Sequence, residues 1–177
     1  LGPRRARTFA ALSRRVVRRR SAERGTITSD GGDPAVGAAI DPASGGGDGC
    51  VETDRSEAPG TIRMVLKREG ARPFTLIGAP RLRAALDLGG AEPGVPQIAA
   101  RLWDVAPGGE SQRLVARGTY RPRQGRNVWQ LHPGAWRFRR GHVAELELLG
   151  NDAPYARPSN GSFEVDVTRL RVALPVR

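Results

Sequence analysis

From residue 61 onwards the chain is built of short segments in which apolar and polar residues alternate. Apolar side chains take every second position in several of them, among them 62–66, 82–88, 98–102 and 146–148. Successive side chains of a β-strand point to opposite faces of a sheet, so a period of two predicts strands with one buried and one solvated face. Glycine and proline clusters separate the segments, as in sandwiches and barrels. We therefore expect an all-β fold over residues 61–177.

The final segment changes parity part of the way along. Apolar residues stand at odd positions from Phe163 to Val167 and at even positions from Leu170 to Leu174. A strand that keeps one face buried through such a shift needs one extra residue. We therefore predict a β-bulge or a strand break near Thr168.

Positive charge is concentrated at the start of the chain. The net charge is +11, and residues 1–25 contribute +8 of it through nine arginines against Glu23, which leaves +3 for the rest. Phe9, Leu12 and Val16 are spaced as on one face of a helix. We predict an Arg-rich lead-in or linker over 1–25, in which residues 5–20 can form a helix. It is either a solvated linker or a basic helix for a membrane surface or RNA. No nucleic-acid partner is predicted for the remainder.

Residues 26–60 carry many Gly, Asp and Pro residues and are predicted to form a loop that Ile27 and the 35–40 stretch attach to the core. This divides the chain into a lead-in (1–25), a Gly/Asp/Pro-rich loop (26–60) and a β-sandwich domain (61–177). The apolar runs are all much shorter than the roughly 18 residues that a transmembrane helix needs, so no membrane span is expected.

Three residues were considered for catalysis. Ser111 lies in the run 109–113, which lacks the second glycine of the nucleophile elbow of serine hydrolases. His132 and His142 could act as general bases by residue type, but each stands in a turn without a nucleophile motif nearby. A turn between strands is the simpler interpretation of all three, and no catalytic residue is predicted.

Metal and cofactor sites are not predicted either. Carboxylates in the glycine-rich loop and near residue 151 could bind a hard cation, but their spacing does not match an EF-hand, and Asp is common in turns. The residues concerned are Asp30, Asp33, Asp41, Asp48, Asn151 and Asp152. A single cysteine and two histidines exclude an internal disulfide framework and a cysteine-based zinc cluster.

The aromatic side chains allow two interpretations. Exposed on a sandwich, they could stack against sugars, as in a carbohydrate-binding module; otherwise they pack in the core. One or both of Trp103 and Trp136 could point away from the main core, and core or interdomain packing is the interpretation we favour. The residues concerned are Trp103, Trp129, Trp136, Tyr120 and Tyr155.

Residues 97–122 and 129–165 carry a more specific pattern. Its main steps are Ala100–Val105, Leu114–Gly118, Phe138–His142 and Leu146–Leu148. This pattern resembles the C-terminal domain of the X-Pro dipeptidyl-peptidase and CocE/NonD hydrolase family. The resemblance covers roughly residues 26–177, and the lead-in departs from it.

The resemblance implies a jelly-roll β-sandwich similar to galactose-binding-like domains. It also implies a parent serine hydrolase whose upstream α/β-hydrolase domain carries a Ser-Asp-His triad and is a partner in cis. None of the triad positions maps onto this sequence. The implied function is a non-catalytic module that packs on the hydrolase core and shapes the cleft of a dipeptidyl-peptidase or esterase; a carbohydrate-binding module is the alternative.

Two further expectations follow from the resemblance. A secreted or cell-envelope location would allow Cys50 to pair with a cysteine of the catalytic part, although Cys50 could equally remain a thiol. Apolar residues that break the alternation, namely Val65, Val115 and Trp103, are candidates for the surface that contacts the hydrolase core.

Overall fold

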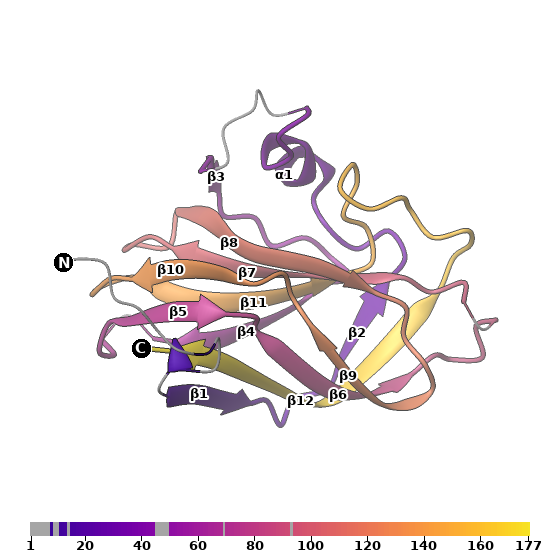
Figure 1. The fold of residues 1–177 in the computed structure, drawn as a ribbon. Helices are drawn as coiled ribbons and strands as arrows, with labels where there is room; N and C mark the ends of the chain where they lie inside the picture. Colours follow the sequence, from indigo (N-terminus) through magenta and orange to yellow (C-terminus); the bar gives the residue numbers. More distant parts are fainter. Residues whose placement is uncertain (1–7, 9–10, 14, 45–49, 69, 93) are drawn as a thin grey trace.

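Two antiparallel sheets account for most of the chain (Figure 1). The structure is a computed structural model that describes residues 8, 11–13, 15–44, 50–68, 70–92 and 94–177. Within these ranges the first sheet contains β1 (Arg15–Arg20), β2 (Gly25–Thr28), β5 (Phe74–Gly78), β6 (Arg81–Asp87), β9 (Gly125–Gln130), β10 (Gly134–Phe138) and β12 (Glu164–Val176). The second contains β3 (Glu52–Asp54), β4 (Ile62–Lys67), β7 (Ile98–Val105), β8 (Ser111–Tyr120) and β11 (Val143–Leu149).

The long strand β12 organises the first sheet. One of its edges pairs with β1 and β2, and the other pairs with β6 and, at its last residue, with β5. Its pairing with β6 shifts register between Thr168 and Arg171, and Arg169 has a φ of 54°. The predicted irregularity near Thr168 is therefore confirmed. It lets apolar residues on both sides of the shift face the same core.

The main core lies between the two sheets and follows the alternation of the sequence. Leu82, Leu86, Ile98 and Leu102 are all at most 2% exposed and belong to one cluster with the inward residues of β11 and β12. An all-β sandwich over the described residues confirms the predicted fold class. No helix in the described ranges is long and apolar enough to cross a bilayer.

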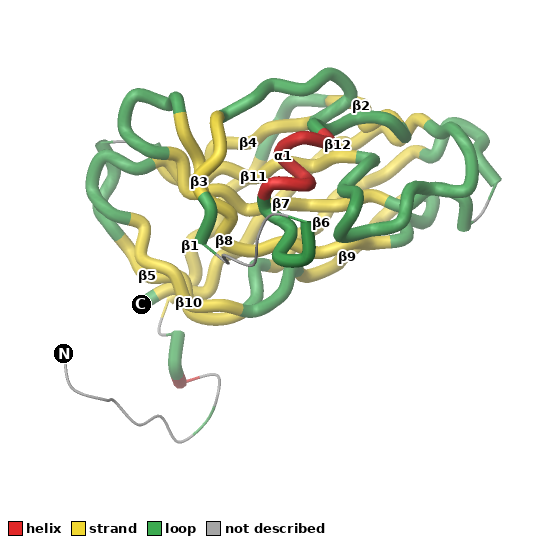
Figure 2. The backbone as a smooth tube through the Cα atoms, turned by 90° about the horizontal axis from the view of Figure 1, so that it is seen from above, coloured by secondary structure: helices red, strands yellow, loops and turns green. Residues whose placement is uncertain are grey.

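The prediction that the other face of the central strands is solvated is wrong for β7 and β11. All eight residues of β7 are buried, and so are the last six of β11. The segment that leads from β2 to β3 covers this outer face. Its short helix α1 (Pro34–Ala39) lies over β7 (Figure 2), and Val36 and Ile40 form a second apolar cluster with Trp103 and Val105.

The predicted helical lead-in is contradicted at residues 15–20, which form strand β1. Its register places Val16 opposite Pro175 and Val17 opposite Leu174, and Val17 packs against the main core. The outer edge of β12 offers a full row of backbone hydrogen-bond partners. Pairing with this edge stabilises a strand at residues 15–20 more than the weak helical pattern stabilises a helix. Residues 5–7, 9–10 and 14 of the predicted helix lie outside the described residues.

The 26–60 segment contains more regular structure than the loop predicted for it. Residues 25–28 form β2, in which Ile27 is fully buried, and α1 and β3 follow. Strand β3 pairs with β8 at the edge of the second sheet. The expectation that Ile27 and the 35–40 stretch attach the segment to the core is confirmed, since Val36 and Ile40 are also buried.

Helix α1 begins at a capping aspartate, which gives a pH-dependent prediction. Asp33 accepts hydrogen bonds from the backbone N–H groups of Ala35 and Val36 at 2.9 and 3.3 Å. Partial burial opposes ionisation of Asp33, but the Ser56 hydroxyl, these N–H groups and the charge of Arg101 outweigh it and hold its pKa below the usual value. A carboxyl with a lowered folded-state pKa stabilises the fold above the pKa of the unfolded chain, and the contribution disappears as the pH falls through the folded value.

We expect Asp33→Ala to lower the free energy of unfolding by about 1 kcal/mol at neutral pH, because the cap is lost. The difference from the parent chain should shrink as the pH falls below the ordinary aspartate range. Urea unfolding at several pH values measures both effects. Asp33→Asn is the control: it keeps a capping oxygen, so most of the stability should remain. Equal stability of Asp33→Ala and the parent at neutral pH would contradict the capping role.

Candidate functional site

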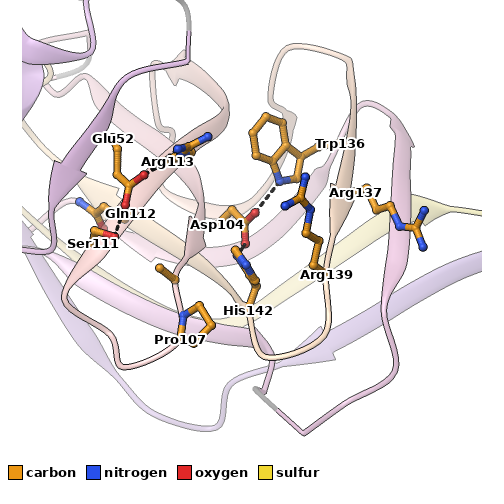
Figure 3. Close-up of a pocket in the computed structure, with 11 residues that line it drawn as sticks. Glu52, Asp104, Pro107, Ser111, Gln112, Arg113, Trp136, Arg137, Arg139 and His142 are labelled. Atoms are coloured by element: carbon orange, nitrogen blue, oxygen red, sulfur yellow. Dashed lines mark hydrogen bonds and ion pairs between the residues drawn. The ribbon is translucent and has the colours of Figure 1, made fainter.

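An open pocket of about 420 Å³ lies where β7, β8, β10 and β11 come together (Figure 3). Alternation along β7 places Asp104 on the same side as Leu102, at the end of the sandwich, where its carboxylate is 5% exposed. One carboxylate oxygen accepts the indole N–H of Trp136 at 2.8 Å, and the other lies 3.1 Å from Nδ1 of His142. Asp104 therefore joins the two sheets at this end of the molecule.

A second group of polar residues forms the opposite wall of the pocket (Figure 3). Glu52 on β3 accepts the hydroxyl of Ser111 and two N–H groups of Arg113, at 3.0 and 2.7 Å, on β8. The Ser111 hydroxyl, followed by the Arg113 guanidinium, holds the pKa of Glu52 below its usual value. The hydrogen bonds that Arg113 donates to the same carboxylate raise the pKa of Arg113. This wall is a solvated ion pair.

These contacts do not form a nucleophile–base pair. In a catalytic triad the serine hydroxyl is hydrogen-bonded to the imidazole. Here the Ser111 hydroxyl is bonded to Glu52, and His142 is bonded through Nδ1 to Asp104. Glu52, whose pKa is lowered, is also a weak base at neutral pH. The predicted position of Ser111, at the end of a turn between two strands, is confirmed by the β7–β8 connection.

His132 lies elsewhere, on the connection after β9. Its Nε2 is 2.6 Å from the hydroxyl of Tyr155, and the Arg117 guanidinium lies 3.7 Å above the Tyr155 ring. Burial raises the pKa of Tyr155, Arg117 opposes that rise, and Asp152 adds to it. The two histidines of the sequence therefore lie apart, in two different connections between strands, as the sequence predicted.

Aspartates of the glycine-rich segment serve its turns. Asp30 accepts the Thr28 hydroxyl, Asp33 caps α1, and Asp41 accepts the N–H groups of residues 43 and 44. Asp48 lies outside the described residues, and Asp152 pairs with Arg101 in the interior. Across the described ranges, His, Cys, Asp and Glu side chains do not gather in groups of three or more that could hold a metal ion.

The aromatic residues do not form an exposed platform. Trp103 does point away from the main core, but it is fully buried beneath α1. Trp129 is 6% exposed and stacks on Tyr120 with a centroid distance of 5.1 Å. Trp136 is half-buried, packs against the main core and lines the pocket. Interior packing therefore explains most of the aromatic residues.

Sequence reasoning did not single out Glu52, Asp104 or Arg113. A signal existed for Asp104, which is a polar residue at an inward-facing position of a buried strand. Glu52 and Arg113 become neighbours only through the β3–β8 pairing, in which they stand directly opposite one another. The sequence around Glu52 does not indicate that pairing.

Comparisons with known proteins support the fold. No family model and no curated protein matches the sequence. An alpha-amino acid ester hydrolase labelled with selenomethionine has a similar structure, with a TM-score of 0.55 and 17% identity over 67% of this chain and 26% of that chain. An aminopeptidase from the marine sediment archaeon Thaumarchaeota archaeon gives a TM-score of 0.54 and 12% identity over 66% of this chain and 26% of that chain.

A CocE/NonD family hydrolase from Staphylococcus aureus aligns with a TM-score of 0.49 and 11% identity, over 72% of this chain and 32% of that chain. The first two similarities establish a shared fold. This chain spans about a quarter of the length of those two proteins. Its β-sandwich therefore has the architecture of one part of much longer hydrolase and aminopeptidase chains.

Proposed function

We propose that this chain is a non-catalytic β-sandwich module of a serine hydrolase that acts on acyl esters or X-Pro peptides. Its partner is an α/β-hydrolase domain in the same polypeptide, upstream of the sandwich. The observation that carries the proposal is the structural match to about a quarter of an ester hydrolase and of an aminopeptidase. In this proposal the module packs on the catalytic domain and forms one wall of its substrate cleft.

The hydrogen bonds in the pocket support a role without chemistry. Ser111 and His142 lie in one pocket, yet each is bonded to a different carboxylate. Forming a nucleophile and a base from them would require the Ser111 hydroxyl to leave Glu52 and bond to Nε2 of His142, whereas the contact between Nδ1 of His142 and Asp104 could remain. The chain's own residues instead provide a rigid and charged surface, in which Asp104 fixes Trp136 and His142.

The surface that docks on the hydrolase domain differs from the one expected. Trp103 is buried beneath α1 and cannot contact a partner, and Val115 is partly buried against the main core. Val65 remains a candidate, because it is 46% exposed on β4, an edge strand of the second sheet. In the part of the chain that the structure describes, the other exposed large apolar residues are Val16 and Val128, on the first sheet. Such scattered apolar residues favour a largely polar interface, as is common between domains of one chain.

The purified chain should show no hydrolase activity of its own. A panel of acyl p-nitrophenyl esters and an X-Pro p-nitroanilide measures this, with Ser111→Ala and His142→Ala as companion variants. We expect the three proteins and the buffer to give the same background rate. Turnover by the parent chain that is lost in Ser111→Ala would show that the pocket is an active site, and the proposal would be wrong.

A carbohydrate-binding function rests on fewer residues than the sequence suggested. Trp103 and Trp129 are buried, so sugar stacking would depend on Trp136 and Tyr155. The Trp136 indole donates to Asp104 and borders the open pocket, which favours it as the position to test. Glycan-array binding that disappears in Trp136→Ala would favour this function over the hydrolase module.

A further inference from the structure

Six arginines line one shallow depression on the outer face of the first sheet. Its volume is about 700 Å³, and β1, β12 and β6 provide its floor (Figure 1). The arginines are Arg18, Arg19, Arg20, Arg81, Arg83 and Arg171, and all six are exposed. Among the described residues that line it there is no carboxylate, and none of the six forms an ion pair with a described Asp or Glu.

Sheet register fixes how these charges are spaced. Arg20 stands opposite Arg171, and Arg171 stands opposite Arg83 on the next strand, so three guanidinium groups form one row across the sheet. Two residues further along, Arg18 and Arg81 flank Ala173 in a second row. Adjacent strands are about 4.8 Å apart, and alternate residues of a strand are about 6.6 Å apart. The five side chains therefore start from a compact patch of about 10 by 7 Å.

Like charges directly opposite one another on a sheet destabilise the pairing. Other arginines of this molecule are balanced by carboxylates, as Arg101 is by Asp152 and Arg113 is by Glu52; this holds for some of the arginines outside the depression. The row of Arg20, Arg171 and Arg83 has no such balance within the described chain. An anion bound in the depression would remove the repulsion.

We propose that this depression binds a compact anion that carries several phosphate groups. Guanidinium groups form paired, charge-assisted hydrogen bonds with phosphate oxygens, and a cluster of them can hold adjacent phosphates at once. The small size of the patch suits a short polyphosphate group better than an extended chain. Ala173 lies between Arg18 and Arg81, and Pro175 lies opposite Val16, so neither of these floor positions brings a competing acceptor side chain. The site does not depend on the proposed hydrolase partner.

Inorganic tripolyphosphate is the probe for this site. Isothermal titration calorimetry at low salt should detect its binding to the parent chain. The double variant Arg83→Gln/Arg171→Gln removes two of the three residues of the central row and should weaken binding at least about tenfold, since each charged hydrogen bond contributes on that scale. Arg72→Gln/Arg140→Gln is the matched control. It removes the same charge from exposed positions outside the depression and should change the Kd by less than about twofold.

Thermal unfolding gives an independent readout. Without the anion, Arg83→Gln/Arg171→Gln should unfold at a higher temperature than the parent in low salt, because cross-strand repulsion is relieved. Added salt should reduce that difference. Tripolyphosphate should raise the unfolding temperature of the parent and of the control variant. The rise should be much smaller for Arg83→Gln/Arg171→Gln.

Two further arms identify the source of the phosphate. Vesicles of phosphatidylcholine with a minor fraction of a polyphosphoinositide can be tested for binding in competition with tripolyphosphate. Competition would support the site, with a lipid headgroup that carries several phosphates as its source. Binding of a single-stranded oligothymidylate will be compared with binding of tripolyphosphate at equal phosphate concentration. Tighter binding of the oligothymidylate would overturn the proposal of a compact site and favour a nucleic-acid site. Absence of tripolyphosphate binding at low salt, or equal weakening in both double variants, would also overturn the proposal.

Discussion

Replacing Arg101 with methionine should lower the free energy of unfolding by about 3–5 kcal/mol. Arg101 is 1% exposed on the outer face of β7; its Nε donates to Asp152 at 3.0 Å, and Nη1 lies 3.6 Å from Glu147. Removing the guanidinium would leave the buried carboxylate of Asp152 without its counter-charge, and Glu147 with Arg63 alone. A buried charge without a partner is among the most destabilising changes in a protein.

Urea unfolding followed by circular dichroism measures this effect. Arg113→Met is the matched control, because Arg113 also bridges to a carboxylate but is exposed; its unfolding midpoint should scarcely move. Adding Asp152→Asn to Arg101→Met should recover part of the loss, because the unpaired charge of Asp152 is then removed. Equal losses in Arg101→Met and Arg113→Met would contradict the account of a buried ionic layer.

Trp103→Ala should lower the free energy of unfolding by about 3–5 kcal/mol as well. The side chain is fully buried between β7 and α1, in contact with the cluster of Val36 and Ile40. Its indole N–H donates to Glu147 at 2.7 Å. The substitution therefore leaves a cavity beneath the helix and also removes a hydrogen bond from a buried carboxylate.

Hydrogen exchange should show where that loss is located. Amides of α1 should exchange faster in Trp103→Ala, whereas those of β12 should keep most of their protection. The exposed Val65 provides the control, since Val65→Ala should change the unfolding free energy by less than about 0.5 kcal/mol. If Trp103 belonged to a docking surface instead, its replacement would leave the stability of the isolated chain unchanged.

The features that sequence predicted well are those set by neighbouring residues. The alternation with a period of two correctly identified which residues of β6, β7 and β12 face the core. It could do so because the direction of each side chain along a strand is a local property. The change of parity between Val167 and Leu170 located the bulge for the same reason. Neither inference needed knowledge of which strands pair.

Burial of charge could not be predicted in this way. Arg101, Glu145 and Glu147 stand at alternating positions that normally face water, yet each is at most 3% exposed. They are buried because a segment more than 40 residues away in sequence covers β7 and β11, and because they pair with one another and with Arg63. Alternation reports only that a residue faces away from the main core, and what lies on that side is set by tertiary contacts.

The lead-in shows a similar limit. Spacing of three and four between Phe9, Leu12 and Val16 is compatible with a helix, but Val16 and Val17 are β-branched and suit a strand equally well. The open edge of β12 decides between the two for residues 15–20. The same pairing brings Arg18 and Arg20 beside Arg83 and Arg171, so the basic depression could not be foreseen from the charge of the first 25 residues.

The most direct test of the hydrolase-module proposal is an assay of the upstream α/β-hydrolase domain with and without this chain. The two purified proteins are mixed, and turnover of the acyl p-nitrophenyl esters and of the X-Pro p-nitroanilide is followed together with the unfolding temperature of the catalytic domain. The account predicts that the chain is inactive alone and that mixing raises the turnover or the unfolding temperature of the catalytic domain. A catalytic domain whose activity and stability are both unchanged by saturating amounts of the chain would contradict it.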